Sequence, residues 1–283
     1  MIKIFMSVRN RLAITQKVIE AIRRNTSTKY QLYVYNNNTT YLVNEHFEYF
    51  CDLYKKKEIT QVSFTTDAST FNAFSKASTC NFFGLQHQQD PNKEKYDFLV
   101  MMDNDIILLP GWDKRVKIAW DFIKKKGDKW NHIKLVGQLP GGIKQKNKEL
   151  INIPGLEAAR TGKLGGSGLW CVKPNFFKDV GLINLARLVG RSKMHDQLYW
   201  RLLEKASGGK HYILGIKPKL GIHCGAIAGS VCNRLERNRR KPAKHKELLI
   251  EFQDQEETIG NLDFDTFYKR ITTAKKYERM RGW

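Results

Sequence analysis

The sequence predicts an α/β protein with a mostly parallel central sheet. Its first half alternates short apolar runs with longer stretches whose apolar residues recur at helical spacing. Residues 2–6, 32–35 and 59–64 have the pattern of strands, and residues 14–22 and 42–54 have the pattern of helices. Strands that alternate with helices pair in parallel through right-handed crossovers. A chain of 283 residues is long enough to bury a large core around such a sheet.

The later elements follow the same reasoning. A helix is expected before residue 98, with an apolar stripe that we assign to the core; the strand 98–102 comes next, then a helix over 112–123 and a strand over 133–137. The second half is richer in glycine, with a strand at 169–172, a helix over 198–205 and a C-terminal helix with a basic tail. The stripe before residue 98 consists of Phe71, Phe74, Ser78, Phe82 and Leu85.

Two acids close the apolar strand 98–102. Asp103 and Asp105 flank Asn104 in the sequence Asp-Asn-Asp. In an open α/β sheet, ligands bind outside the carboxyl ends of the strands. Two carboxylates there can hold Mg²⁺ or Mn²⁺, which in turn neutralises a diphosphate. The alternative is a surface turn, since Asp and Asn commonly end strands.

Composition narrows the class of protein. No run approaches the about 20 apolar residues that cross a bilayer, and the chain opens with a strand pattern instead of a signal peptide. We therefore expect a cytoplasmic protein. The five cysteines are dispersed and have no Cys-x-x-Cys spacing, so neither a disulfide framework nor a zinc ribbon is indicated.

The net charge points to an anionic partner. Lys and Arg number 49 against 28 Asp and Glu, a formal charge of +21. Such an excess attracts polyanions, and phosphate contacts release counterions. Nucleic acid and an anionic surface both fit, although runs of charge also form solvated faces. The densest segment, 234–246, supplies the candidate phosphate-binding residues Arg234, Arg237, Arg239, Arg240 and Lys241.

Two features of the second half have both a functional and a structural interpretation. The glycines around Ser167 allow close approach of the backbone to a ligand, or form a tight bend. Asp196, after His195, stands where a general base or a helix-capping acid would stand.

The order of these features resembles the GT-A glycosyltransferases, most closely the inverting family 2 type. The matching motifs are the polar turn after the first strand, a helix that bears an Asn, the Asp-x-Asp strand, the glycine-rich strand entry and the acid at a helix start. The family's acidic turn after its second strand is replaced here by asparagines, and its Glu-Asp pair by His-Asp. The residues concerned are Ser7 to Asn10, Asn36 to Thr39, Asn81, Asp103 to Asp105, Gly166 to Trp170 and His195-Asp196.

The resemblance implies a GT-A domain over residues 1–225, with a nucleotide-sugar-binding half at 1–137 and an acceptor and catalytic half at 138–225. Residues 226–283 then form a basic helical extension. Asp103 would orient the ribose or share the metal, and Asp105 and His223 would ligate Mn²⁺ or Mg²⁺. Asp196 would be the base of an inverting transfer, with His195 as its alternative or its orienting partner. The residues implied in nucleotide-sugar binding, with uracil as the preferred base, are Ser7, Val8, Arg9, Asn36, Asn37, Asn81, Asp103, Asn104, Gly166 and Ser167.

Three functional hypotheses remain open at this stage. The basic excess favours a DNA-modifying glycosyltransferase of phage type, working in the host cytoplasm, which adds a sugar to a hydroxymethylated pyrimidine flipped out of the duplex. The second hypothesis is a transferase for a surface glycan or lipopolysaccharide, held against an anionic membrane. The third is a nucleic-acid-binding protein with a degenerate transferase fold.

Overall fold

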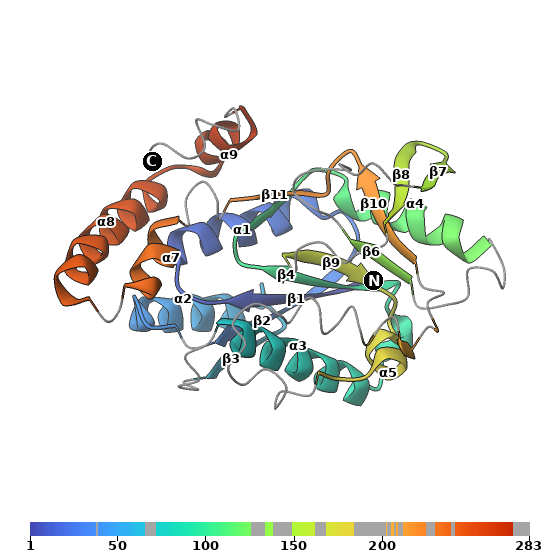
Figure 1. Ribbon diagram of the computed structural model, residues 1–283, viewed down its shortest axis with the longest axis horizontal. Helices are drawn as coiled ribbons and strands as arrows, with labels where there is room; N and C mark the ends of the chain where they lie inside the picture. Colours follow the sequence, from blue (N-terminus) through green and yellow to red (C-terminus); the bar gives the residue numbers. More distant parts are fainter. Residues whose placement is uncertain are drawn as a thin grey trace.

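The structure is a computed structural model. It describes residues 1–37, 39–65, 72–125, 134–137, 149–161, 168–183, 202, 205–206, 208, 212–224, 230–238 and 241–273. The predicted α/β class is confirmed: a central sheet is covered by helices on both faces (Figure 1). All five cysteines are free thiols.

The described elements alternate strands and helices through the first half of the chain, as the sequence predicts. This half contains β1 (Ile2–Val8), α1 (Leu12–Asn25), β2 (Tyr30–Asn37), α2 (Val43–Lys55), β3 (Gln61–Thr65), α3 (Asn72–Gln89), a 3₁₀ turn (Lys93–Lys95), β4 (Phe98–Asp103), β5 (Ile106–Leu108), α4 (Trp112–Lys125) and β6 (Lys134–Gly137). The second half contains β7 (Glu149–Ile153), β8 (Leu156–Thr161), β9 (Leu169–Val172), α5 (Phe176–Val180), β10 (Tyr212–Lys217), β11 (Gly221–His223), α7 (Ser230–Arg237), α8 (Pro242–Gly260) and α9 (Phe264–Thr273).

Nine of these strands form one sheet in the order β3-β2-β1-β4-β9-β6-β10-β8-β7. The strands β3, β2, β1 and β4 are parallel, and so are β6 and β10. Strand β9 runs antiparallel to both β4 and β6, and β8 runs antiparallel to both β10 and β7. The sheet is therefore mostly parallel, and β9 and β8 are its reversed strands.

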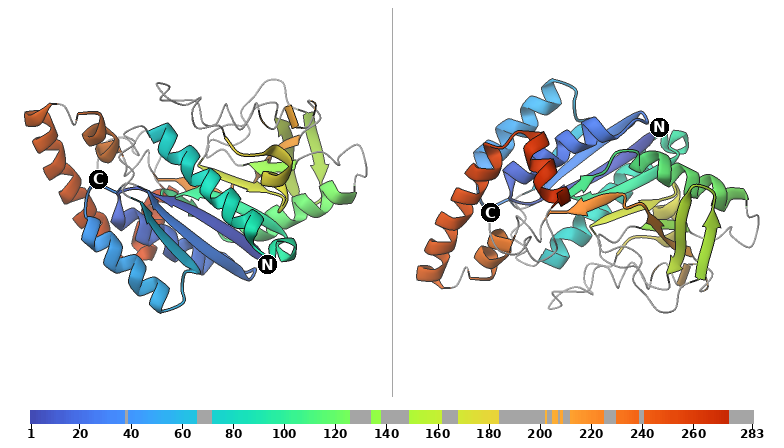
Figure 2. Two further views of the ribbon diagram at one scale, coloured as in Figure 1. Left: turned by 90° about the horizontal axis from the view of Figure 1, so that it is seen from below. Right: turned by 90° about the horizontal axis from the view of Figure 1, so that it is seen from above.

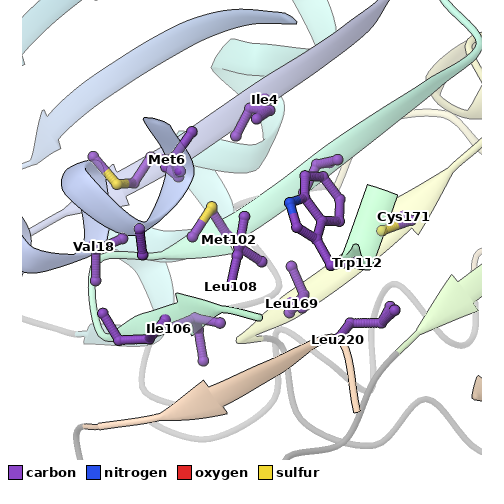
Figure 3. Packing of buried hydrophobic residues seen from close by; sticks show 14 of the residues in the cluster. Ile4, Met6, Val18, Met102, Ile106, Leu108, Trp112, Leu169, Cys171 and Leu220 are labelled. Atoms are coloured by element: carbon purple, nitrogen blue, oxygen red, sulfur yellow. The ribbon is translucent and has the colours of Figure 1, made fainter. Parts of the chain in front are cut away.

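Two cores lie on the two faces of the sheet. On one face, residues of α1, α4 and α9 pack against the strands, and Figure 3 shows Met6, Met102 and Leu108 beside Val18 of α1. Trp112, at the start of α4, is fully buried in this cluster. The other face carries α3 and α5, which lie below the sheet in Figure 1.

The predicted apolar stripe of α3 is confirmed at Phe82, which packs against the core, and is wrong at Leu85; Phe71 lies outside the described residues and the Phe74 side chain is not described. Leu85 is 46 % exposed. The neighbouring Gly84 faces α5: a Cβ atom there would come within 2.7 Å of Cδ1 of Phe177. Helix α5 packs directly against the backbone at this glycine. The buried apolar residues of α3 are Ala77, Cys80 and Phe83.

The C-terminal helices share the core of the sheet. Ile259 of α8 and Phe267 and Ile271 of α9 belong to the same buried cluster as α1. Helix α8 and the β7–β8 hairpin lie at opposite ends of the long axis of the molecule (Figures 1 and 2). The domain boundary expected at residue 225 stays a prediction, and the helices beyond it extend the packing around α1. No helix in the described part of the chain is long and apolar enough to cross a membrane.

Candidate functional site

The carboxyl ends of three neighbouring strands bring the predicted site residues together. Strand β1 lies between β2 and β4, and in the paired register Ser7 stands beside Asp103 while Val8 stands beside Asn36. The turns after β1, β2 and β4 consequently meet at one edge of the sheet. This is the edge at which open α/β sheets bind ligands.

Asp103 ends β4 and faces the entry of β9. Its backbone N–H donates to the carbonyl of Gly168 at 2.9 Å. A Cβ atom on Gly168 would lie 3.1 Å from Cδ1 of Ile106 and 3.8 Å from Oδ2 of Asp103, so a glycine lets the two segments approach closely. Asp103 also borders a small cavity of about 10 Å³ together with Ser7 and other residues. Gly166 and Ser167, predicted to bind the nucleotide sugar, lie outside the described residues.

Asn104 points away from Asp103, toward the start of α1. Its side chain is buried, and Nδ2 donates to the carbonyl of Asn10 at 3.0 Å and to Oγ1 of Thr15 at 2.8 Å. Its backbone N–H donates to the carbonyl of Ser7 at 3.1 Å. These bonds tie the turn after β4 to the turn after β1. The predicted contact of Asn104 with a nucleotide stays a prediction, beside this structural role.

Asp105 lies between a guanidinium and an imidazole. Nη1 of Arg11 is 2.6 Å from Oδ2 of Asp105, and Nε2 of His223 is 3.3 Å from the same oxygen. Strand β11 brings His223 there, because it pairs with β5 so that His223 stands opposite Ile106. The bond with the Asp105 carboxylate raises the pKa of His223, and the charge of Asp103 adds to this effect against the burial of the ring.

Arg11 is a site residue that the sequence analysis missed. It follows the predicted turn directly, has a positive φ of 57°, and precedes the first residue of α1. Asn10 before it also has a positive φ, 53°, and Asn tolerates this region better than most residues. The turn thereby places the Arg11 side chain against Asp105. Only its neighbour Arg9 was assigned, and the sequence holds no signal that distinguishes the two arginines.

Asn10 also joins the turn after β1 to the turn after β2. Its Oδ1 accepts hydrogen bonds from the backbone N–H groups of Thr40, at 2.9 Å, and Tyr41, at 3.1 Å. Its own N–H donates to Oγ1 of Thr39 at 3.2 Å. Asn10 is fully buried. It is therefore the common anchor of the two turns, a role that no pattern in the sequence indicates.

The predicted base-reading asparagines are buried and bonded within the protein. Thr39 donates its hydroxyl to Oδ1 of Asn36. Nδ2 of Asn37 donates to Oγ1 of Thr79 at 3.0 Å, which joins the end of β2 to α3. Recognition of a nucleobase by these two side chains stays a prediction.

Asn81 forms its hydrogen bonds with the segment that follows α5. Its amide exchanges two hydrogen bonds with the backbone of Ile183, at 2.8 and 2.9 Å. This pair fixes the segment after α5 against α3. The predicted role of Asn81 in binding a nucleotide sugar likewise stays a prediction.

The predicted base and part of the basic segment are not described. His195 and Asp196 lie outside the described residues, and so do Arg239 and Arg240. Arg237 ends α7 and Lys241 precedes α8. Arg234 forms an ion pair with Glu251 of α8, so its charge is compensated locally.

The donor atoms around Asp105 suit a hard divalent cation. Carboxylate oxygens are favoured by Mg²⁺ and Mn²⁺, and an imidazole suits Mn²⁺ better. Asp103, Asp105 and His223 offer such donors. Within the described residues, however, no three acidic, cysteine or histidine side chains are drawn together tightly enough to enclose an ion. Arg11 holds the Asp105 oxygen that His223 also faces, and a metal at this place has to share Asp105 with the guanidinium.

No protein-family model matches the sequence, and no curated protein matches it. Solved structures do match. TarS of S. aureus superposes with a TM-score of 0.50 at 12 % identity, over 98 % of this chain and 46 % of that one. The chain thus spans about half the length of that TarS structure.

Two further structures superpose equally well. GalNAc-T7 with UDP, GalNAc and Mn²⁺ has a TM-score of 0.50 at 11 % identity, over 96 % of this chain and 56 % of that one. The mannosyltransferase PcManGT of Pyrobaculum calidifontis, with GDP-Man and Mn²⁺, has a TM-score of 0.50 at 9 % identity, over 98 % and 76 %. Likeness at this identity concerns the fold. The chain has the GT-A fold of glycosyltransferases, as the sequence predicts.

Proposed function

We propose that the chain is a metal-dependent glycosyltransferase that uses a nucleoside-diphosphate sugar. The observation that carries the proposal is the convergence of Asp103, Asp105, Arg11 and His223 at the carboxyl edge of the parallel strands in a GT-A fold. GalNAc-T7 is complexed with UDP and Mn²⁺, and PcManGT with GDP-Man and Mn²⁺. The proposal extends that chemistry to this chain, with UDP as the preferred nucleotide.

The residues divide the work of the transfer. Mn²⁺ or Mg²⁺, when bound, acts as a Lewis acid for the leaving diphosphate. Arg11 holds the Asp105 carboxylate at 2.6 Å and adds a fixed positive charge at the same edge. Such preorganised charge stabilises negative charge that develops in a transition state. Asn104 and Asn10 hold the turns after β1, β2 and β4 together through their hydrogen bonds.

The proposed transfer is inverting. Asp196 accepts the proton of the acceptor hydroxyl as it attacks the anomeric carbon, and the nucleoside diphosphate leaves from the opposite face. His195 is the alternative base or the orienting group for Asp196. Both assignments rest on the resemblance to inverting family 2 enzymes.

The proposed acceptor is a hydroxymethylated pyrimidine in DNA. The formal charge of +21 supports a polyanionic acceptor. Lys241, Lys244 and Lys246 are exposed around the start of α8, beside the segment that contains Arg234 to Arg240. A glycan or lipopolysaccharide acceptor is the second candidate, and the same charge would then face an anionic membrane.

The experiment is a transfer assay on DNA. Duplexes with hydroxymethylcytosine or hydroxymethyluracil are incubated with the protein, Mn²⁺ and a panel of UDP and GDP sugars. The DNA is then digested to nucleosides, whose masses are determined by mass spectrometry. We expect a hexose or N-acetylhexosamine mass on the modified base, which disappears with EDTA and with Asp105→Asn. The control Asp121→Asn changes an acid of α4 that pairs with Lys117 and whose side chain is 44 % exposed, and it should leave the product unchanged.

The outcomes separate the three hypotheses. Transfer only to a glycan or lipid acceptor removes the DNA proposal and leaves the transferase. Absence of both transfer and donor hydrolysis, with DNA affinity unchanged in Asp105→Asn, leaves a nucleic-acid-binding protein that uses a transferase fold.

A further inference from the structure

A second polar pocket lies at the opposite edge of the sheet from the site around Asp105. It has a volume of about 320 Å³ and opens between the starts of β1, β2 and β3 and the end of α3. Lys3 lines it, whereas Ser7, on the same strand, belongs to the other edge. Four residues of a strand span about 13 Å. The pocket is therefore separate from the candidate transferase site.

The floor of the pocket is an ion pair enclosed by aromatic rings. Lys3 is 1 % exposed, and its Nζ lies 2.5 Å from Oδ2 of Asp90. The same ammonium lies 4.4 Å from the ring centroid of Tyr33 and 5.0 Å from that of Tyr96. Lys3 lies on the same face of β1 as the buried Phe5, where an apolar side chain would be expected. A buried ion pair is seldom more stabilising than packed apolar residues, which favours a role in recognition.

The walls of the pocket carry amides with unused hydrogen-bonding capacity. Oε1 of Gln31 accepts from the hydroxyl of Tyr33 at 3.3 Å, and it shares the single hydroxyl hydrogen of Tyr96 with Oδ2 of Asp90, which lies 3.0 Å from that hydroxyl. This leaves both N–H donors of Gln31 for another partner. Nε2 of Gln61 donates to Oγ of Ser63 at 3.4 Å, and its carbonyl oxygen remains. Gln86 also lines the pocket.

These features of the pocket suit a neutral ligand that is rich in hydroxyl groups. Amides both donate and accept, as hydroxyl groups do. The formal charges of Lys3 and Asp90 cancel, so the lining offers no uncompensated cation for a phosphate. The tyrosine rings add apolar surface with polar ends. A volume near 300 Å³ is at the lower limit for small-molecule pockets.

We propose that this pocket binds a neutral saccharide unit, independently of the site around Asp105. The tyrosine-braced Gln31 donates to ring hydroxyls, Gln61 accepts from them, and Gln86 contacts the sugar from α3. The proposal goes beyond the proposed transfer reaction, because binding here needs neither a nucleotide nor a metal. It describes a place where the protein holds a glycan without modifying it.

The test is direct binding of defined sugars to the full chain. Glucose, galactose, N-acetylglucosamine and maltotetraose are the saccharide probes, and uridine and inorganic phosphate represent other ligand classes. Saturation-transfer NMR detects binding and calorimetry gives the affinity. We expect at least one saccharide to bind, and Gln31→Ala and Gln86→Ala each to weaken it by about tenfold, the cost of roughly one hydrogen bond.

The controls keep the two sites apart. Gln88 lies on the same helix as Gln86 but outside the pocket lining. The Gln88→Ala variant should therefore bind the sugar as the unaltered protein does. Asp103→Asn should also retain it. Three results would overturn the proposal: no probe sugar binds, binding survives both pocket variants, or binding is lost in Asp103→Asn. Binding of uridine or phosphate that is lost with Gln86→Ala would overturn the saccharide class.

Discussion

Glu256, near the end of α8, accepts a hydrogen bond of 2.8 Å from the backbone N–H of Ala13, in the first turn of α1. The backbone N–H groups at the start of a helix have no partner within the helix. Arg11, at the N-cap position of α1, provides no side-chain cap. The capping carboxyl is that of Glu256, 243 positions after Ala13 in the chain. The same turn presents Arg11 to Asp105. Helix α8 therefore supports the geometry of the candidate site.

Glu256 should make the stability of the protein depend on pH. Burial raises its pKa from 4.5 to about 7, against the opposing effect of the hydrogen bonds from the Ala13 and Leu12 backbone. A group whose pKa is raised in the folded state contributes stability at low pH and loses it as pH rises through the folded value. The free energy of unfolding of the unaltered protein, measured relative to that of the Glu256→Gln variant, should fall by about 3 kcal/mol between pH 4.5 and pH 7.

The measurement is chemical denaturation of both proteins across this pH range. Glu257→Gln is the matched control, since Glu257 follows in the same helix and is exposed. It separates the effect of burial at position 256 from that of replacing an exposed acid on the same helix. A Glu256→Gln difference that does not vary with pH would show that the carboxyl is not shifted by its burial.

Asn104 should be essential for stability even though it lies between Asp103 and Asp105, the two acids predicted to bind the metal. Asn104→Asp keeps the shape of the side chain but removes the N–H donor that bonds the carbonyl of Asn10 and Oγ1 of Thr15. It also buries a charge beside Asp105. A loss of at least about 1–3 kcal/mol in the free energy of unfolding is expected. The exposed Asn44→Asp on α2 should change it little, and equal losses in the two variants would argue against the network.

Strands β1 to β4, β6 and β9 could be predicted from the sequence because most of them are short apolar runs. The pattern at 98–102 leads to β4, Phe98–Asp103, and the pattern at 169–172 coincides with β9. Alternation with helices was sufficient to predict that β1, β2, β3 and β4 are parallel. Strands β5, β7, β8, β10 and β11 were not predicted. β5 and β11 have three residues each, too few for a periodic pattern to be detected. β7 and β8 mix polar with apolar residues, and Gly215 interrupts the apolar run of β10.

Helix α8 was predicted only as part of a basic helical extension over residues 226–283, without bounds of its own. Its buried residues include Gln255 and Glu256, polar side chains that hide the helical period. The acid is buried because it caps α1, a tertiary contact that no local window contains.

The candidate site was predicted in part. Asp103, Asp105 and His223 follow from the strand end and the resemblance, and the structure brings Asp105 and His223 together. Arg11 and Asn10 could not be chosen, because their roles depend on two consecutive positive φ angles after β1.

Gly221 should control the position of His223. A Cβ atom at Gly221 would lie 2.9 Å from the carbonyl oxygen of Ile107 and 3.0 Å from Cγ2 of Ile106. Gly221→Ala must therefore move β11 away from β5, with His223 two residues further on. We expect a loss of about 1–3 kcal/mol in stability and weaker Mn²⁺ binding by calorimetry. Gly260→Ala meets no atom within 4 Å and is the control; Mn²⁺ affinity that is unchanged in Gly221→Ala would separate His223 from the metal.

Arg11 should oppose metal binding and yet promote transfer. Its guanidinium lies 2.6 Å from Oδ2 of Asp105, so a divalent cation competes with it for this carboxylate. Arg11→Met removes the competitor, and we expect tighter Mn²⁺ binding by calorimetry. The variant also removes a fixed positive charge, which should lower kcat for sugar transfer by about 10²–10³-fold. Asp105→Asn should lose both properties, whereas Arg24→Met, at an arginine paired with Glu20 and Asp265, should change neither. Weaker Mn²⁺ binding in Arg11→Met would instead mean that Arg11 orients Asp105 as a ligand, and unchanged transfer would place the leaving diphosphate elsewhere.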